Sequence, residues 1–166
     1  MILDIGSGIN KFHRHLKGEN VIHFDISKKA FGLNVNGDAH FLPFKDKSFD
    51  FVVLSHVLEH CYNPFNVLNE VKRVSKDKIL IVVPNCGYWK GLPEDTTHLF
   101  TWSHFSFFQL LSKVFNFVDV KTLYEFKQTE YIRNCGFIKR VYYLFKLRLF
   151  TTLNKQGNSL YGYCKN

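Results

Sequence analysis

Short apolar runs alternate along this chain with stretches whose apolar residues recur at helical spacing. The runs are rich in β-branched and aromatic residues and have the length of strands. They cover residues 2–5, 20–25, 33–37, 48–55, 78–84, 117–123 and 159–164. The run at 78–84, KILIVVP, is the most apolar and predicts a central strand.

Three stretches between the runs predict helices. In the first, Asn10 is suited to cap a helix that places Ile9, Phe12 and Leu16 on one face. The second begins at Asn63-Pro64, an N-cap followed by proline in the first turn, and the third spans 103–115. The residues expected to face the core are Phe65, Leu68, Val71 and Val74 in the second helix and Phe107, Phe108, Leu111, Val114 and Phe115 in the third. Alternating strands and helices indicate βαβ units, hence an α/β fold with a parallel sheet covered on both faces.

Length and composition suit one soluble domain. The chain has 166 residues, 46% of them apolar, and no apolar run approaches the roughly 20 residues of a membrane span. Because the first predicted strand starts at residue 2, we expect no signal peptide and a cytoplasmic location. The four cysteines lie far apart without a CxxC pair, which predicts free thiols.

The net charge of +8 is concentrated near the C-terminus. From Tyr131 onward the chain holds seven basic residues and no Asp or Glu. Residues 137–150 mix these charges with large apolar side chains, a pattern typical of an amphipathic helix. Such a basic C-terminal segment could cover the sheet, contact a membrane surface or pair two subunits as a homodimer.

The start of the chain, MILDIGSG, predicts a strand that ends in a tight glycine turn. A strand that stops at Gly6 and Gly8 before a helix leaves backbone N–H groups available to a ligand. Acids follow the next two predicted strands, Asp25 and Asp38, at the edge of a parallel sheet where ligands bind. The dinucleotide pattern GxGxxG fails because position 11 is Lys11, so a nucleoside without a pyrophosphate fits better.

Four motifs in order resemble the class I S-adenosylmethionine-dependent methyltransferases, in particular the small-molecule methyltransferase-domain type. They are LDIGSG, FDIS, GDAHFLPFKDKSFDFVVLSHVLEH and VVPN, and the likeness covers residues 2 to about 123. The resemblance implies a Rossmann-like, doubly wound sheet of seven strands in a three-layer α/β/α arrangement. Its last strand would run antiparallel, at 159–164. We therefore expect a single domain over 1–166, with a cofactor-binding half (1–85) and an acceptor-side half (86–166).

The resemblance also implies how S-adenosyl-L-methionine would be held at its methionine end. Asp4, Gly6 and Gly8 would form the loop that faces the methionine part. Ser55 and His56 would lie near the reacting methyl group.

At the nucleoside end, the resemblance assigns Asp25 to the ribose hydroxyls and Ile26 to the adenine ring. Asp38 would accept from the adenine amino group, and the Ala39 backbone N–H would donate to the ring. One departure is Asn10, which stands where the family has a third glycine; asparagine tolerates positive φ, so only a modest weakening is expected. A second is the lack of helices before the first strand, so the cover is expected from residues 86–101 or from the basic segment.

Three histidines are candidate catalytic bases, in the order His98, His60 and His56. Transfer to a hydroxyl needs a base, whereas an amine need only be unprotonated. His56 to His60 also reads H-x-x-E-H, a zinc-peptidase signature that requires both histidines on one helical face. Here the run begins at the end of a strand, so no metal site is expected.

The expected activity is methyl transfer to oxygen, less readily to nitrogen, of a small-molecule, sugar or lipid-linked acceptor. A nucleic-acid methyltransferase that uses the basic tail is disfavoured, because the chain lacks the family's N/D-P-P-Y/F/W run after the fourth strand and any Pro-Cys pair. The alternative from another class is a cofactor-binding or inactive methyltransferase-fold domain that works as an interaction module.

Overall fold

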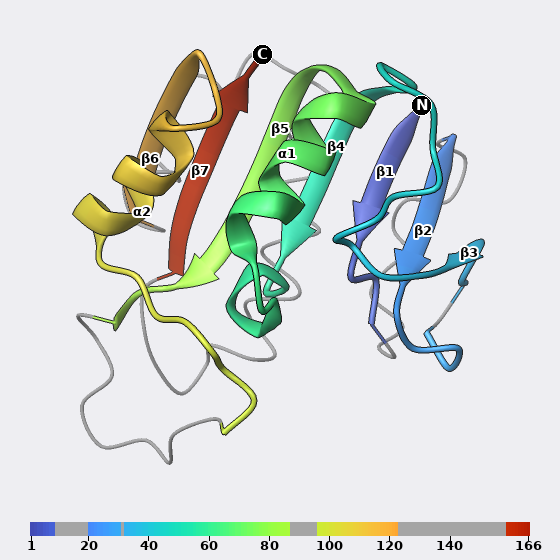
Figure 1. Cartoon of the computed structure of the whole chain (residues 1–166), viewed down its shortest axis with the longest axis horizontal. Helices are drawn as coiled ribbons and strands as arrows, with labels where there is room; N and C mark the ends of the chain where they lie inside the picture. The colour runs from blue at the N-terminus through green and yellow to red at the C-terminus, as the bar shows by residue number, and fades with distance from the viewer. Residues whose placement is uncertain (9–19, 31, 87–95, 123–158) are drawn as a thin grey trace.

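Seven strands form one sheet in the computed structural model, which describes residues 1–8, 20–30, 32–86, 96–122 and 159–166. The strands are β1 (Ile2–Ile5), β2 (Val21–Asp25), β3 (Val35–Asn36), β4 (Phe49–Ser55), β5 (Ser75–Pro84), β6 (Phe117–Thr122) and β7 (Ser159–Lys165). Their order is β3-β2-β1-β4-β5-β7-β6. All neighbours among β1 to β5 pair in parallel, while β7 is antiparallel to both β5 and β6 (Figure 1). The expected seven-stranded sheet with an antiparallel last strand is confirmed.

Two α-helices lie on the same face of the sheet, α1 (Pro64–Val74) and α2 (His104–Ser112), as Figure 1 shows. The Asn63 side chain caps α1 by accepting from the Asn66 backbone N–H at 3.1 Å. Ser103 begins α2 with a capping box shared with Ser106. The Asn63 cap agrees with the sequence-based expectation, and the third predicted helix is present, although it ends at Ser112 rather than at residue 115.

Side chains alternate between the two faces of the central strands, and both faces are buried. On the face that carries the helices, Leu3, Val52 and Ile79 belong to the main apolar cluster. On the opposite face, Phe51 and Leu80 form a second cluster with Tyr161 of β7. A parallel strand buried on both faces reads as a continuous apolar run, which is why β4 and β5 were recognisable in the sequence.

Two aromatic residues that were expected to face the core do not. Phe65 is 45% exposed because α1 turns Pro64, Val67 and Leu68 toward the sheet and leaves Phe65 on the other side. Phe108 is 42% exposed, whereas the preceding Phe107 is completely buried. The prediction was therefore wrong for one residue in each helix, because the buried face of the helix is narrower than the apolar pattern suggested.

Other expectations fall outside the described residues. These are the first helix with its Asn10 cap, most of the 86–101 loop, the amphipathic segment 137–150 and a helical layer on the second face. No helix within the described ranges is both long enough and apolar enough to cross a bilayer.

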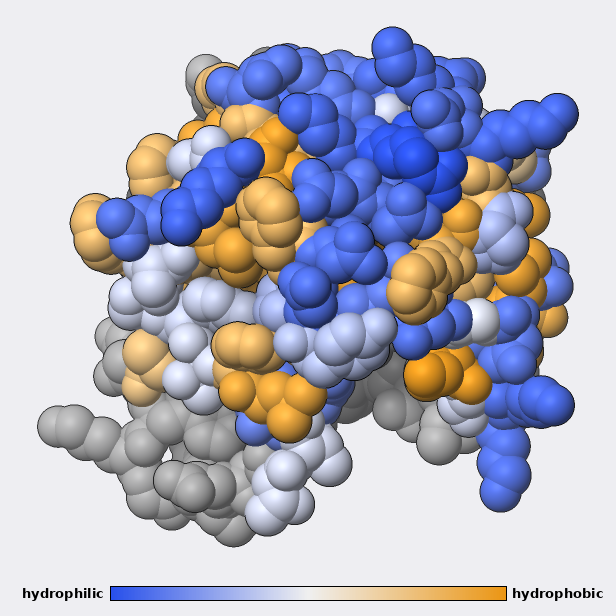
Figure 2. Space-filling view, viewed as in Figure 1, coloured by the Kyte–Doolittle hydropathy of each residue, from blue (hydrophilic) through white to orange (hydrophobic). Residues whose placement is uncertain are grey.

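The sheet order reverses between β1 and β4, since the chain runs outward through β2 and β3 and then returns to β4. The carboxyl ends of β1, β2, β4 and β5 all point to the lower edge in Figure 1, and both chain termini lie at the upper edge. Figure 2 shows hydrophilic residues gathered along that upper edge and hydrophobic ones over α2. Ligands of open parallel sheets bind beyond the carboxyl ends at the reversal point, so the lower edge is where a site is expected.

Candidate active site

A pocket of about 380 Å³ opens at the carboxyl ends of β1, β2 and β4. Its volume falls within the range of about 300–1,000 Å³ typical of small-molecule sites. Most of the sequence-predicted site residues line it: Gly6, Gly8, Asp25, Ile26, Asp38, Ala39, His56 and His60. The fold thus brings together residues from four separate segments of the chain.

The glycine turn after β1 forms one wall of the pocket. Gly6 and Gly8 have φ angles of 70° and 71°, a region that L side chains rarely adopt. A Cβ on Gly6 would also stand 2.1 Å from Cγ2 of Val57, so no side chain fits there. Glycine at position 6 is required by both conformation and space, which fixes the close approach of this turn to the segment after β4.

Asp25, at the end of β2, is tied to the glycine turn. One carboxylate oxygen accepts from the Gly8 backbone N–H at 2.7 Å, and the other accepts from the Ser27 N–H at 2.7 Å. Each carboxylate oxygen has a second lone pair, so Asp25 retains capacity to accept from a ligand's hydroxyls. The side chain is held rigidly by these bonds while it lines the pocket.

Asp38 occupies the loop after β3 and is paired with His40. The His40 backbone N–H donates to Asp38 Oδ1 at 2.9 Å, and its ring Nδ1 lies 2.5 Å from the same oxygen. Burial raises the pKa of Asp38, but the His40 backbone and ring N–H groups outweigh it and leave that pKa below its ordinary value. Asp38 is therefore a carboxylate, an acceptor, at neutral pH.

His40 also joins this loop to α1. Its Nε2 accepts from the Asn63 backbone N–H at 3.2 Å, which with the Asp38 contact defines a neutral ring protonated at Nδ1. The ring stacks on Tyr62 with centroids 3.7 Å apart. His40 is almost fully buried, so it acts as a fixed support behind Asp38.

His56 follows β4 and turns into the pocket through a strained backbone. Its φ is 56°, a conformation in which histidine is more common than most residues, and its N–H donates to the Val82 carbonyl of β5 at 2.9 Å. Its Nδ1 lies 3.2 Å from Oε1 of Glu59, whose side chain is completely buried. A carboxylate that orients an imidazole in this way fixes which nitrogen faces outward.

Three predicted residues do not line the pocket. Asp4 alternates to the opposite face from Leu3 and Ile5 and lies 3.2 Å from Nδ1 of His23 on the neighbouring strand. Ser55 is buried behind the pocket, and its hydroxyl has no hydrogen-bond partner. His98 contacts His60 edge to face at 4.8 Å between centroids, but it is not part of the wall.

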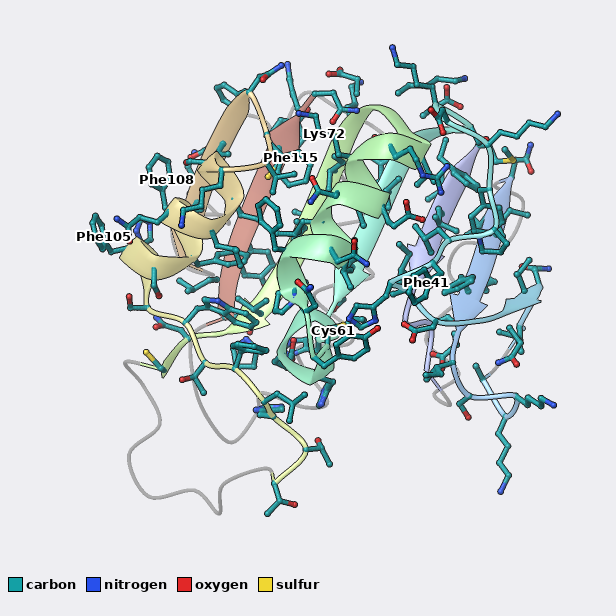
Figure 3. All side chains as sticks on the ribbon, in the orientation of Figure 1. Phe41, Cys61, Lys72, Phe105, Phe108 and Phe115 are labelled. Carbon is teal, nitrogen blue, oxygen red and sulfur yellow. The ribbon has the colours of Figure 1, made fainter. Side chains whose placement is uncertain are left out.

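Several residues that line the pocket were not predicted from the sequence, among them Gly37, His40, Val57, Cys61 and Tyr62. Burial, followed by the charges of Asp38 and Glu59, raises the pKa of the Cys61 thiol to about 12, so the thiol is protonated. In Figure 3 Cys61 lies at the lower end of α1, at the edge where the pocket opens. A histidine two positions after an aspartate is the one signal that could have indicated the Asp38–His40 turn.

The pocket is acidic and carries no fixed positive charge among its described lining residues. Asp25 and Asp38 are its carboxylates, and no Lys or Arg belongs to the described wall. Phosphates favour Arg, Lys or clustered backbone N–H groups, so a phosphate-free nucleoside fits this wall better than a dinucleotide. The acids would also favour a ligand that carries positive charge.

Residues 3–83 match the family model described as a methyltransferase domain. That range contains the first three methyltransferase-like motifs, the start of the fourth, and the segments that form the pocket. The Rossmann-like fold described above agrees with this match to a methyltransferase domain.

Solved structures of the same fold cover almost the whole chain. An S-adenosylmethionine-dependent methyltransferase of Archaeoglobus fulgidus has a TM-score of 0.63 at 22% identity, covering 99% of this chain and 85% of that one. The phosphoethanolamine N-methyltransferase 2 of Haemonchus contortus, in complex with S-adenosyl-L-methionine, has a TM-score of 0.63 at 16% identity, with 99% and 48% covered. The likeness in fold and the match over residues 3–83 both support the resemblance to the class I S-adenosylmethionine-dependent methyltransferases seen in the sequence.

Curated relatives match about half of the chain. An uncharacterized protein of Methanocaldococcus jannaschii is 39% identical over 93 residues, which are 51% of this chain and 41% of the relative. A second protein of the same organism is 38% identical over 88 residues, 48% of this chain and 42% of the relative. The chain thus spans less than half the length of these relatives.

Proposed function

We propose that this domain binds S-adenosyl-L-methionine and transfers its methyl group to an oxygen of a small-molecule, sugar or lipid-linked acceptor. The observation that carries the proposal is the pocket in which the glycine turn, Asp25 and Asp38 surround one space, with no lysine or arginine in its described wall. The sulfonium and ammonium groups of this donor are cationic and its nucleoside has no phosphate, so the wall complements both.

In the proposed complex each predicted residue has a role that its position allows. Asp25 accepts from the ribose hydroxyls, and Ile26, which is 74% exposed without a ligand, covers the adenine. Asp38 accepts from the adenine amino group, and the Ala39 N–H donates to the ring. The turn at Gly6 and Gly8 faces the methionine part.

His56 is the base that the geometry favours, ahead of His60 and His98. It lines the pocket, and its Nδ1 is held by the buried carboxylate of Glu59. His56 takes the acceptor's hydroxyl proton at Nε2, and the oxygen attacks the methyl carbon. The carbon–sulfur bond breaks with its electron pair left on sulfur, giving S-adenosylhomocysteine. Holding the reacting atoms in line supplies much of the rate.

A nitrogen acceptor is the second candidate, supported by the likeness in fold to an N-methyltransferase. The His56–Glu59 pair favours oxygen, because a hydroxyl must lose its proton and an amine has only to be unprotonated. Methyl transfer to hydroxyl and amine compounds of matched carbon skeleton distinguishes the two.

Calorimetric titration with S-adenosylhomocysteine tests the cofactor assignment. We expect one site, weakened at least about tenfold by Asp25→Asn, because a lost hydrogen bond to a charged group is worth about 1.5–3 kcal/mol. Asp119→Asn, on β6 and paired with Lys121, is the control and should bind like wild type. Absence of binding by the wild-type chain would overturn the proposal.

Label transfer from the methyl-labelled donor then separates the remaining alternatives. Counts in a small-molecule fraction support the proposal, and counts in RNA or DNA point to the nucleic-acid alternative. Tight binding of the donor without transfer to any fraction supports the interaction module instead.

A further inference from the structure

Beside the pocket, three potential metal ligands come together from two segments of the chain. Glu59 and His60 belong to η2 (Leu58–His60), and His98 precedes α2. One carboxylate oxygen and one ring nitrogen from each histidine lie within 4.8 Å of one another. Neither the family match nor the proposed methyl transfer accounts for this cluster.

Glu59 has a carboxylate oxygen that the protein leaves unused. The side chain is completely buried, and only Oε1 has a contact, at 3.2 Å from Nδ1 of His56. Oε2 is buried and has no hydrogen-bond partner among the residues that the structure describes. A buried carboxylate oxygen without a donor is strongly unfavourable, so burial here indicates a cation at this position.

The backbone holds the two segments together at this point. The Glu59 carbonyl accepts from the Leu99 N–H at 2.8 Å and from the Phe100 N–H at 3.3 Å. These bonds fix the segment that carries His98 against η2. The arrangement of Glu59 and His98 is therefore built into the fold and does not depend on a chance approach of surface side chains.

His60 has the support that metal-binding histidines have. Its Nδ1 lies 3.1 Å from both the carbonyl oxygen and the hydroxyl oxygen of Thr97. The carbonyl can only accept and the hydroxyl can also accept, so a proton on Nδ1 satisfies both contacts and leaves Nε2 its lone pair. A ring N–H donated to a backbone carbonyl is the usual means of orienting a ligating histidine. The rings of His60 and His98 meet edge to face at 63°, and each offers a nitrogen within 4.8 Å of a Glu59 carboxylate oxygen.

We propose that Glu59, His60 and His98 bind a divalent transition-metal ion of the zinc or manganese class. Two imidazoles and one carboxylate suit such ions, whereas Mg²⁺ and Ca²⁺ prefer all-oxygen sites. Ligands around a tetrahedral ion with bonds of about 2.1 Å stand about 3.4 Å apart, so the three side chains close inward by rotation when the ion binds.

The proposed site differs from the zinc-peptidase pattern in H-x-x-E-H. That pattern uses both of its histidines, but here the Nδ1 of His56 is engaged with Glu59 and His98 supplies the second imidazole. His56 is then the group that orients Glu59, with Oε1 receiving its N–H and Oε2 directed to the ion.

The role of the ion rests on the proposed function. Three protein ligands leave a coordination position open, and His60 also lines the pocket, so the ion adjoins the acceptor side. An acceptor hydroxyl bound to the ion loses its proton to His56 more readily, and the oxygen then attacks the methyl carbon as described. The substrate class is accordingly an acceptor whose reacting hydroxyl can bind a metal.

The test uses the whole chain, stripped of metal with a chelator and titrated with Co²⁺ while its visible d–d absorption is followed. Wild type should bind one equivalent. Glu59→Gln and His98→Ala should each weaken binding at least about 100-fold, since even residues that only support a ligand contribute about 10- to 100-fold. His104→Ala, which removes a nearby histidine outside the cluster, should bind Co²⁺ like wild type.

S-adenosylhomocysteine binding to the same samples separates the two proposals. If Co²⁺ gives no spectrum, or binds equally to wild type and His98→Ala, the metal site is overturned even where the nucleoside binds. If Co²⁺ binds as expected and S-adenosylhomocysteine does not, the proposed function fails and the metal site stands. His98 is partly exposed, so its variant stays informative even if Glu59→Gln does not fold.

Discussion

His40 and Asp38 are joined twice across a two-residue turn, through the backbone N–H and the ring of His40, both directed to the same carboxylate oxygen. The other ring nitrogen of His40 receives the Asn63 N–H at the start of α1. One buried imidazole therefore sets the position of Asp38 relative to the helix.

Replacing His40 by alanine is expected to lower the free energy of unfolding by about 2–3 kcal/mol, since each buried partner left unsatisfied costs about 1–3 kcal/mol. The affinity for S-adenosylhomocysteine should fall as well, because Asp38 loses its support. Urea unfolding and calorimetry measure the two effects. His104→Ala, which removes one contact to the Val120 carbonyl from an exposed ring, should change each by less. Equal effects from both variants would contradict this role for His40.

The glycine turn offers a matched pair of substitutions. Gly6 and Gly32 have similar φ angles, 70° and 67°, but a Cβ on Gly32 would meet nothing closer than 3.6 Å. We expect Gly32→Ala to cost about 1–2 kcal/mol for the left-handed backbone alone. Gly6→Ala should cost about 1–3 kcal/mol more in folding stability, because its Cβ also clashes with Val57. Thermal unfolding of the two variants tests the difference, which should be accompanied by loss of nucleoside binding only at Gly6.

The lowered pKa of Glu70 should make the folded protein less stable as the pH falls into the acid range. Hydrogen bonds from Arg73 lower the pKa of Glu70 below its ordinary value of 4.5, and burial only partly opposes them. The unfolded chain thus takes up this proton at higher pH than the folded protein. The stabilisation is complete above pH 4.5 and is lost as pH falls through the lower, folded-state pKa.

Glu70→Gln should flatten this acid limb of the stability curve, measured as melting temperature between neutral pH and about pH 3. Asp46→Asn is the control: Asp46 also contacts Arg73, but its side chain is 74% exposed, so its contribution is about 0–1 kcal/mol. An unchanged acid limb in Glu70→Gln would show that the Arg73 contact does not set the pKa of Glu70.

His56→Asn probes the proposed base with little backbone penalty, because asparagine also tolerates positive φ. Turnover should fall by about 10²- to 10⁴-fold, the usual contribution of general base catalysis, while S-adenosylhomocysteine binds as in wild type. Loss of both turnover and binding would assign His56 a structural role. Steady-state rates and calorimetry on the same preparation provide the comparison.

The sheet could be predicted from the sequence because its strands are bounded, continuously apolar runs. SFDFVVLS and KILIVVP became β4 and β5 nearly as expected, and the N-caps Asn63 and Ser103 marked the starts of both helices. Helical periodicity was less decisive. It could not show whether Phe65 and Phe108 faced the sheet, because two adjacent apolar residues can both lie near the edge of an inner stripe.

Site residues at the ends of strands could be predicted from the sequence. Contacts between residues of separate loops could not. Asp25 is the last residue of β2 and Asp38 lies two residues after β3, so topology placed them at one edge. His40 and Tyr62 meet across separate loops, and no spacing in the sequence encodes that stacking. The proximity of His98 to Glu59 likewise depends on backbone bonds between distant segments.

The position of β7 in the sheet determines when β5 and β6 can complete their strand pairing during synthesis. Among the described strands β7 comes last in the chain, yet it lies between β5 and β6, with all seven of its residues paired to β5. Until it emerges from the ribosome, the Ile79–Val83 edge of β5 lacks its neighbour, and β6 has no strand to join. An unpaired apolar edge is prone to association with other chains, so this edge of β5 is open to such association until synthesis passes residue 165.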